Sequence, residues 1–167
     1  EFEQKYGRLC IDLLKESQDY LDNPVKLKND ILNKRKQFQA SQMAFPEPDQ
    51  FTYRSMRYQR FVEDPDCLKN YILSDNENYS EKVSFLPYIM DIEPNSRCNF
   101  RCIMCQVSDW DKGQRARDMT FEEYQDLIDS NPQLLEIKLQ GMGEPLLHKD
   151  FIKMIEYASA KHIWVRT

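Results

Sequence analysis

The stretch Cys98–Cys105, "CNFRCIMC", decides how this chain is interpreted, because it places three of the five cysteines within eight residues. Their spacing is Cys-x-x-x-Cys-x-x-Cys. Thiolates are soft ligands that suit zinc and iron–sulfur clusters, and without an export signal clustered cysteines indicate metal binding or catalysis more often than disulfides. The other two cysteines, Cys10 and Cys67, lie far away in the sequence and have no companion cysteine. The sequence therefore predicts a metal site with three cysteine ligands.

The number of thiolates separates the possible metal sites. A structural zinc site takes four ligands, usually as two cysteine pairs, and here His148 remains open as a fourth ligand. A [4Fe-4S] cluster that only transfers electrons normally takes four thiolates. Three thiolates leave one iron open to a substrate or cofactor, as catalytic zinc sites leave one position open. We favour such a cluster on Cys98, Cys102 and Cys105, with zinc and three structural cysteines at chance spacing as the alternatives.

The composition is that of an ordinary globular protein. The chain has 167 residues, of which 41% are hydrophobic and 31% charged, and its formal net charge is −5. An acidic chain is a poor candidate for nucleic-acid binding, so no nucleic-acid partner is expected. No apolar run reaches the length of a membrane span, so no membrane partner is expected. The first residues, "EFEQKYGRLC", lack the apolar core of a signal peptide, which predicts a cytoplasmic location.

Residues 1–84 are expected to form a mostly helical N-terminal region of unknown role. Asn23–Pro24 and Asp64–Pro65 look like helix starts, with a capping residue followed by proline at the first helical position. Residues 44–64 contain two prolines and many aromatic residues and are expected to be irregular, and residues 74–84 are expected to be a linker. The first helix is indicated by apolar residues at helical spacing: Phe2, Tyr6, Leu9, Leu13 and Leu14.

Residues 85–167 alternate between predicted strands and predicted helices. The strands are "FLPYIMDIEP", "LLEIKLQ" and "IWVRT"; Thr120 and Glu123 form a capping box for the first helix, and Asp150 is expected to cap the second. This alternation favours a parallel sheet with right-handed crossovers. The cysteine stretch follows the first strand and the loop "GMGEPLLH" follows the second, so both are expected at the carboxyl ends of the strands, where such folds carry their chemistry.

The stretch "CNFRCIMC", placed after the first strand, resembles the hallmark of the radical S-adenosylmethionine (radical SAM) enzymes. This resemblance implies that Cys98, Cys102 and Cys105 hold three irons of a [4Fe-4S] cluster. It also implies that the amino and carboxylate groups of S-adenosylmethionine (SAM) chelate the fourth iron.

A second motif supports the same resemblance. The family carries a Gly-Gly-Glu-type motif after the second strand, which contacts the methionyl amino group of SAM. Here Gly143 and Glu144 match this motif and Met142 replaces its first glycine. The resemblance therefore implies that Met142, Gly143 and Glu144 bind SAM. Glycine allows a close approach of the backbone, and a carboxylate forms a charge-assisted hydrogen bond with an ammonium group.

The resemblance covers roughly residues 86–167 and implies the first half of a partial (β/α)6 radical SAM barrel. It implies an enzyme, of the oxidoreductase or transferase class, that reductively cleaves SAM to a 5'-deoxyadenosyl radical for hydrogen abstraction. The substrate, whether peptide, protein or small molecule, is not specified, and an electron donor such as flavodoxin or ferredoxin is implied. The phrases "IEPNSRCNFRCIMC" and "LQGMGEPLLHKDFIKMIEYA" most resemble the branch with SPASM domains, which includes maturases.

The chain begins at Glu1 and ends at Thr167 within a predicted strand, so we expect it to be a fragment that is poorly active by itself. The alternatives to a radical SAM enzyme of this branch are a non-enzymatic zinc- or iron–sulfur-binding module, an electron carrier whose cluster ignores SAM, and a glycyl-radical-activating enzyme. Cluster reconstitution followed by addition of SAM separates the first two from the enzyme.

Overall fold

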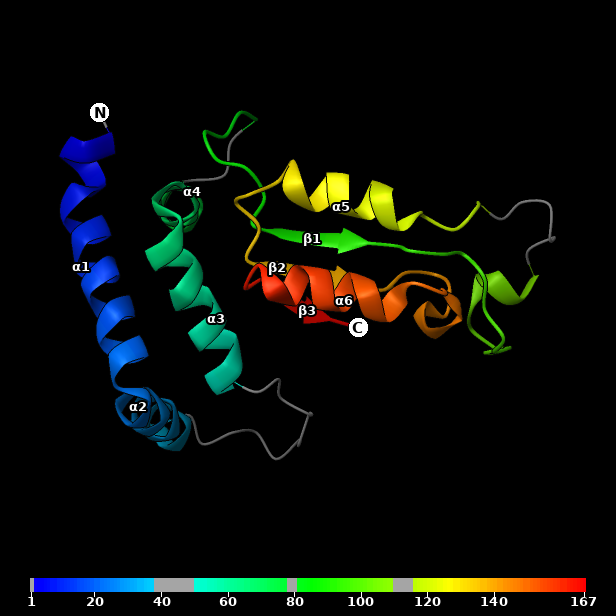
Figure 1. Cartoon of the computed structure of the whole chain (residues 1–167), viewed down its shortest axis with the longest axis horizontal. Coiled ribbons are helices and arrows are strands. Elements are labelled where there is room, and N and C mark those ends of the chain that lie inside the picture. Colours follow the sequence, from blue (N-terminus) through cyan, green and yellow to red (C-terminus); the bar gives the residue numbers. More distant parts are fainter. Residues whose placement is uncertain (1, 38–49, 78–80, 110–115) are drawn as a thin grey trace. The chain divides into compact units, whose positions relative to one another are not determined.

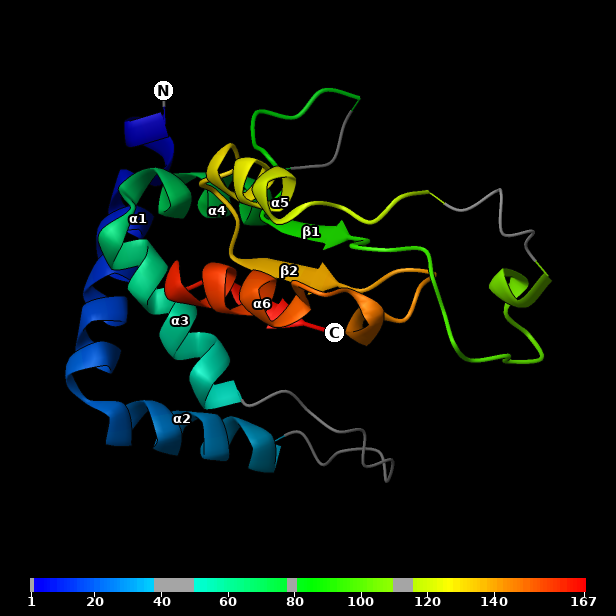
Figure 2. The same ribbon diagram turned by 45° about the vertical axis from the view of Figure 1, so that its right-hand side comes forward.

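The structure of the chain is a computed structural model that describes residues 2–37, 50–77, 81–109 and 116–167 (Figures 1 and 2). The chain divides into two compact units, Glu1–Leu86 and Pro87–Thr167. The division into independent domains between residues 84 and 85 stays a prediction. In the part of the chain described, none of the helices combines the length and the apolar character that crossing a bilayer requires.

The first unit is helical, as predicted. At the first predicted helix start, the Asn23 side chain accepts a hydrogen bond from the Lys26 N–H at 3.2 Å. At the second, the Asp64 carboxylate accepts the N–H groups of Asp66 and Cys67, each at 3.1 Å. Both predicted starts are therefore confirmed. The helices are α1 (Phe2–Asp22), α2 (Pro24–Gln37), α3 (Gln50–Glu63) and α4 (Pro65–Asn76), and α1 and α3 lie side by side.

Two expectations for this unit are wrong. Residues 50–63 form α3 rather than an irregular segment, while residues 44–49 lie outside the described part of the chain. The aromatic residues of α3 have helical spacing: Phe51 and Tyr58 pack on the buried cluster of Tyr20, Leu27 and Ile31. The predicted linker at 74–84 is wrong at its beginning, because α4 continues to Asn76. Prolines in the first segment and polar residues in the second concealed a helical pattern.

The second unit is a three-stranded parallel sheet with two helices, and this confirms the predicted α/β character. The sheet order is β1-β2-β3, with Ile92 beside Leu139 and Lys138 beside Arg166. A complete barrel stays a prediction. The elements are β1 (Ile89–Ile92), the 3-10 helix η1 (Gln106–Asp109), α5 (Phe121–Asp129), β2 (Glu136–Leu139), the 3-10 helix η3 (Pro145–Leu147), α6 (Phe151–Ala160) and β3 (Trp164–Arg166).

One face of this sheet carries the core of the unit. Ile137 and Leu139 of β2 are fully buried among side chains of α5 and α6. The alternate residues Glu136 and Lys138 lie on the opposite face, where Glu136 pairs with Arg166 of β3 at 2.5 Å. The packed face is completed by Ile92, Tyr124, Ile128, Leu134, Phe151, Met154, Ala158 and Ile163. The register of the strands, with Ile92 beside Leu139, places the loops that follow β1 and β2 next to each other.

The two helix caps of this unit differ. The capping box of α5 is confirmed, because the Glu123 N–H donates to the Thr120 hydroxyl at 3.1 Å and the Thr120 N–H donates to the Glu123 carboxylate at 2.8 Å. The expectation that the Asp150 side chain caps the second helix of this unit is wrong. This residue precedes α6 but makes no capping hydrogen bond, and its carboxylate pairs with Lys153 at 3.1 Å instead.

Candidate functional site

The two loops with unusual sequences leave the same edge of the sheet (Figure 1). β1 and β2 are parallel neighbours, so their carboxyl ends, Ile92 and Leu139, lie beside each other. We call residues 93–109 together with 116–119 the cysteine loop, and residues 140–150 the glycine loop. Their meeting at this edge agrees with the sequence prediction and with the position of active sites in parallel α/β folds.

All three clustered cysteines lie on the outer part of the cysteine loop. Cys98 and Cys105 are partly buried and Cys102 is exposed. The Cys105 N–H donates to the Cys102 carbonyl at 3.0 Å and closes a tight turn, which leaves the side chains of Ile103 and Met104 almost fully exposed. No disulfide joins any of the five cysteines, all of which belong to the described residues.

This loop supplies the donors for a metal cluster without holding them in a finished site. Among the residues that the structure describes, no three His, Cys, Asp or Glu side chains are gathered as metal ligands. Three soft thiol donors on one largely exposed loop nevertheless fit the chemistry of an iron–sulfur cluster, because such clusters are held by thiolates. The assignment of Cys98, Cys102 and Cys105 as ligands stays a prediction.

The cysteine loop begins and ends in a stem, residues 94–97 and 116–119. This stem is hydrogen-bonded to the glycine loop through both the N–H and the carbonyl group of Glu144. The Glu144 N–H donates to the Arg97 carbonyl at 2.7 Å. The Asn95 side-chain amide donates to the Glu144 carbonyl at 3.1 Å, and its oxygen accepts the Arg97 N–H at 3.0 Å. Asn95 is 3% exposed, so these bonds are shielded from water. The loop that carries the cysteines and the loop that carries Glu144 therefore form one connected structure.

The close contact between the loops requires glycine at two positions. A Cβ on Gly141 would lie 2.3 Å from Cγ of Glu93, and a Cβ on Gly143 would lie 2.3 Å from the Asn95 carbonyl oxygen. Between them, the Met142 N–H donates to the Glu93 carboxylate, and the Gly143 N–H reaches the same oxygen at 3.2 Å. Gly141 and Gly143 are thus two positions of this loop at which a side chain is excluded.

Glu144 also has a local structural role. Its carboxylate accepts the Leu146 N–H at 3.1 Å and so caps η3. The side chain is partly exposed at the edge of the sheet. Its contact with SAM, like those of Met142 and Gly143, stays a prediction.

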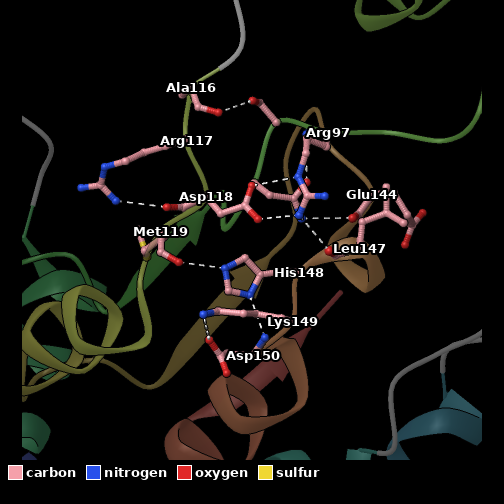
Figure 3. Close-up of polar contacts among 12 residues, drawn as sticks. Arg97, Ala116, Arg117, Asp118, Met119, Glu144, Leu147, His148, Lys149 and Asp150 are labelled. Carbon is pink, nitrogen blue, oxygen red and sulfur yellow. Dashed lines mark hydrogen bonds and ion pairs between the residues drawn. The ribbon is translucent and has the colours of Figure 1, made fainter. Parts of the chain in front are cut away.

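Arg97 connects three segments through its guanidinium group (Figure 3). Its Nε donates to Oδ1 of Asp118 at 3.0 Å, and its Nη2 donates to Oδ2 of the same carboxylate. Nη2 also donates to the Leu147 carbonyl at 2.9 Å. The hydrogen bond from Arg97 lowers the pKa of the Asp118 carboxyl group, so the pair stays charged at neutral pH. The side chain of Arg97 thereby connects the beginning of the cysteine loop to the end of the same loop, and connects both to the glycine loop.

Backbone and hydroxyl bonds close the same stem. The Met119 N–H donates to the Pro94 carbonyl at 2.9 Å. The Ser96 hydroxyl donates to the Ala116 carbonyl at 3.1 Å (Figure 3). Residues 94–97 and 116–119 therefore lie against each other, and the outer part of the loop, with its three cysteines, projects from a closed base.

His148 is a structural residue in this arrangement. It is 4% exposed, and its Nδ1 accepts the Asp150 N–H at 3.1 Å. Its Nε2 therefore carries the proton that is donated to the Met119 carbonyl at 2.8 Å (Figure 3). Both ring nitrogens have protein partners, so this geometry does not favour His148 as the fourth ligand of a zinc site.

Sequence reasoning missed four residues that shape this edge of the sheet: Glu93, Asn95, Arg97 and Asp118. Their signal was weak. Arg97 directly precedes the first clustered cysteine, and polar residues fill the short segment between the strand and that cysteine. Their partners lie 21 to 50 residues away along the chain, so pairwise spacing did not reveal them.

Comparison with known proteins finds a family whose profile covers this edge of the sheet. The sequence profile of the Radical SAM superfamily matches residues 92–166. The chain is 33% identical over 67 residues, 38% of its length, to the tungsten-containing aldehyde ferredoxin oxidoreductase cofactor-modifying protein of Pyrococcus furiosus. It is 30% identical over 83 residues, 48% of its length, to the mycofactocin maturase MftC of Mycolicibacterium smegmatis.

These matches span only about a fifth of each relative, 18% and 20% of their lengths. No solved structure matches the chain significantly. The family match includes both loops, with the clustered cysteines and Gly143–Glu144 at the carboxyl ends of β1 and β2. Residues 92–166 of the chain therefore match the Radical SAM superfamily.

Proposed function

We propose that this chain provides the cluster-binding and SAM-contacting part of a radical SAM enzyme. Cys98, Cys102 and Cys105 bind three irons of a [4Fe-4S] cluster, and residues 142–144 contact SAM. The observation that carries the proposal is the 2.7 Å hydrogen bond from the Glu144 N–H to the Arg97 carbonyl, because it joins the two motifs at one edge of the sheet.

The cysteine loop suits a cluster with one open position. Its three thiols lie outside the closed stem, where a cluster can approach them without disturbing the core. When bound, the reduced cluster and SAM supply the one-electron cleavage that yields the 5'-deoxyadenosyl radical. The thiols have to be deprotonated to bind iron, and a reducing cytoplasm keeps them available for it.

The glycine loop suits the amino-acid end of SAM. Gly143 brings the backbone close to a ligand because it has no side chain. The Glu144 carboxylate has two oxygens with several lone pairs, so it can accept a hydrogen bond from an ammonium group while it still caps η3. Met142 contributes through its backbone, whose N–H is already held by Glu93.

The substrate is proposed from the two relatives. One is a maturase and the other a cofactor-modifying protein, which favours an enzyme that modifies a precursor molecule. The precursor is a peptide, a protein or a small molecule, and the electron donor is a flavodoxin or ferredoxin. The likeness of the cysteine and glycine loops to the SPASM branch supports the proposal of a maturase of that kind.

Anaerobic reconstitution of the 167-residue chain with iron and sulfide tests the proposal. We expect a brown protein with about four irons per chain, whose reduced cluster changes its EPR spectrum when SAM is added. Cys98→Ala, Cys102→Ala and Cys105→Ala should each lose the cluster. Cys10→Ala and Cys67→Ala are the matched controls and should keep it.

Three results would contradict the proposal. A colourless protein with tightly bound zinc would favour a non-enzymatic binding module. A cluster whose EPR spectrum ignores SAM would favour an electron carrier. Normal cluster content in all three loop variants would show that Cys98, Cys102 and Cys105 are not the ligands.

A further inference from the structure

We propose that Arg97 is a positioning residue that holds the cysteine loop and the glycine loop at a fixed separation, so that one SAM molecule can contact both. This proposal rests on the proposed function, because it assumes a cluster on the cysteine loop. It assigns to Arg97 a role in SAM binding that is separate from binding the cluster.

The side chain of Arg97 bridges the two loops directly. Asp118, at the end of the cysteine loop, receives two hydrogen bonds from the guanidinium group, and the Leu147 carbonyl of the glycine loop receives one (Figure 3). A planar guanidinium group fixes both distance and angle when it binds a carboxylate through two nitrogens. Displacement of Arg97 would therefore change the position of one loop relative to the other.

The backbone of Arg97 is fixed as well. Its N–H donates to the Asn95 side chain at 3.0 Å and its carbonyl accepts the Glu144 N–H at 2.7 Å. Cys98 is the next residue, so the first thiol directly follows a residue with four hydrogen-bonded partners, two through its backbone and two through its side chain. The separation between this thiol and Glu144 thus depends on the geometry of a single residue.

The ion pair between Arg97 and Asp118 is exposed enough that it contributes little to folding stability. The side chain of Arg97 is 47% exposed and that of Asp118 is 31% exposed. Pairs with such exposure contribute little to folding stability. They can still matter for binding, because a displacement of about 1 Å in a site that positions reacting groups costs up to about 100-fold in rate.

Arg117 provides a matched control from the same segment. Its guanidinium group pairs with Glu123 at the beginning of α5, with Nη1 2.8 Å from Oε2, and both side chains are exposed. It therefore makes a similar ion pair next to Asp118 without reaching the glycine loop. Any general effect of losing a guanidinium group near the cysteine loop would appear in both arginines.

The experiment compares Arg97→Lys, Asp118→Asn and Arg117→Lys with the unchanged chain after anaerobic reconstitution. Iron content measures cluster binding, and a SAM titration of the EPR spectrum gives the SAM concentration at half-maximal change. For Arg97→Lys and Asp118→Asn we expect iron content within about twofold of the unchanged chain and a half-maximal SAM concentration at least about tenfold higher. Arg117→Lys should match the unchanged chain in both measurements.

A second measurement needs no cluster. Amide hydrogen exchange in the metal-free protein should be at least about tenfold faster at the Glu144 N–H in Arg97→Lys, and unchanged in Arg117→Lys. If Arg97→Lys fails to fold by circular dichroism, Asp118→Asn decides by the same criteria.

The outcomes separate this proposal from the proposed function. An unchanged chain that binds no cluster, or a cluster that ignores SAM, overturns the proposed function and the role of Arg97 with it. If the unchanged chain responds to SAM and Arg97→Lys has the same half-maximal SAM concentration, only the role of Arg97 is overturned and the proposed function stands. Equal shifts in Arg97→Lys and Arg117→Lys also overturn it, because the effect would then come from the loss of any guanidinium group near the cysteine loop and not from the bridge that Arg97 makes.

Discussion

Gly143 lies in direct contact with Asn95: a Cβ built on Gly143 would lie 2.3 Å from the Asn95 carbonyl oxygen and 2.4 Å from its side-chain oxygen. Asn95 cannot move aside easily, because it is 3% exposed and its side chain is bonded to both Arg97 and Glu144. The contact between the two loops therefore depends on the missing side chain at position 143.

Gly143→Ala should destabilise the second unit and separate the loops. Overpacking of a tight contact costs about 1–3 kcal/mol, and here the neighbouring atoms include backbone, which yields less than a flexible side chain. The free energy of unfolding from urea denaturation measures this loss. Faster amide exchange at the Glu144 N–H would show that the loops have moved apart.

Gly7→Ala is the matched control. Gly7 lies within α1, and the nearest atom to its built Cβ is the end of the flexible Glu3 side chain, at 3.3 Å. Alanine in a helix interior should stabilise the protein by about 0.5–1 kcal/mol. A Gly143→Ala protein as stable as Gly7→Ala would contradict the contact at Asn95.

His148→Ala should cost stability without changing metal content. The substitution leaves the Met119 carbonyl and the Asp150 N–H without their partner, which costs about 1–3 kcal/mol for buried polar groups. Chemical denaturation measures the stability, and metal analysis after reconstitution measures the metal. A folded variant that has lost its metal would identify His148 as a ligand instead.

Tyr124→Phe should stabilise the second unit or leave it unchanged. Tyr124 is fully buried, and its hydroxyl has no hydrogen-bond partner within the described part of the chain. Burial raises the pKa of this hydroxyl, so it remains protonated and unsatisfied at neutral pH. Its removal should raise the free energy of unfolding by up to about 1 kcal/mol, because the cost of burying it disappears.

The neighbouring ring gives the control for that substitution. The Tyr157 hydroxyl donates to the Asp129 carboxylate at 2.7 Å, and the rings of Tyr124 and Tyr157 meet edge to face at 6.4 Å. Tyr157→Phe also removes a tyrosine hydroxyl, but this hydroxyl makes a hydrogen bond. The substitution should therefore lower the free energy of unfolding by about 0.5–1.5 kcal/mol. A larger loss from Tyr124→Phe than from Tyr157→Phe in the same urea experiment would contradict this difference.

Local patterns in the sequence predicted most of the fold. The capping box of Thr120 and Glu123 and the helix start at Asn23 each depend on residues at most three positions apart, and both appear as predicted. The alternation of strands and helices predicted that the cysteine loop and the glycine loop would share one edge of the sheet. The failure at α3 has the same origin, because neighbouring prolines outweighed a helical spacing of aromatic residues.

The connections within the candidate site could not be predicted in this way. Glu93 meets Met142 across 49 positions and Arg97 meets Leu147 across 50, and no short-range pattern encodes such pairs. Gly141 and Gly143 were recognisable as glycines, but the atoms that exclude a side chain there come from the other loop. The sequence therefore identified the two motifs, and the folded chain supplied the residues that join them.

Glu123 should make the stability of the second unit depend on pH in a defined range. The hydrogen bond from Arg117, followed by that from the Thr120 backbone, lowers the pKa of Glu123 from 4.5 to about 2. The folded-state pKa lies below the unfolded value, so this contribution to stability is present above pH 4.5 and is lost as the pH falls toward 2.

Glu123→Gln keeps an acceptor for the Thr120 N–H but removes the charge that pairs with Arg117. Because this pair is exposed, the melting temperature of the unchanged chain should exceed that of Glu123→Gln only slightly at pH 7, and the difference should shrink below pH 4.5 and vanish near pH 2. Glu122→Gln, which removes the same charge from the same helical turn, should leave the melting temperature at pH 7 closer to that of the unchanged chain. A difference between the unchanged chain and Glu123→Gln that stays constant from pH 7 to pH 2 would mean that the ion pair with Arg117 contributes nothing to the fold.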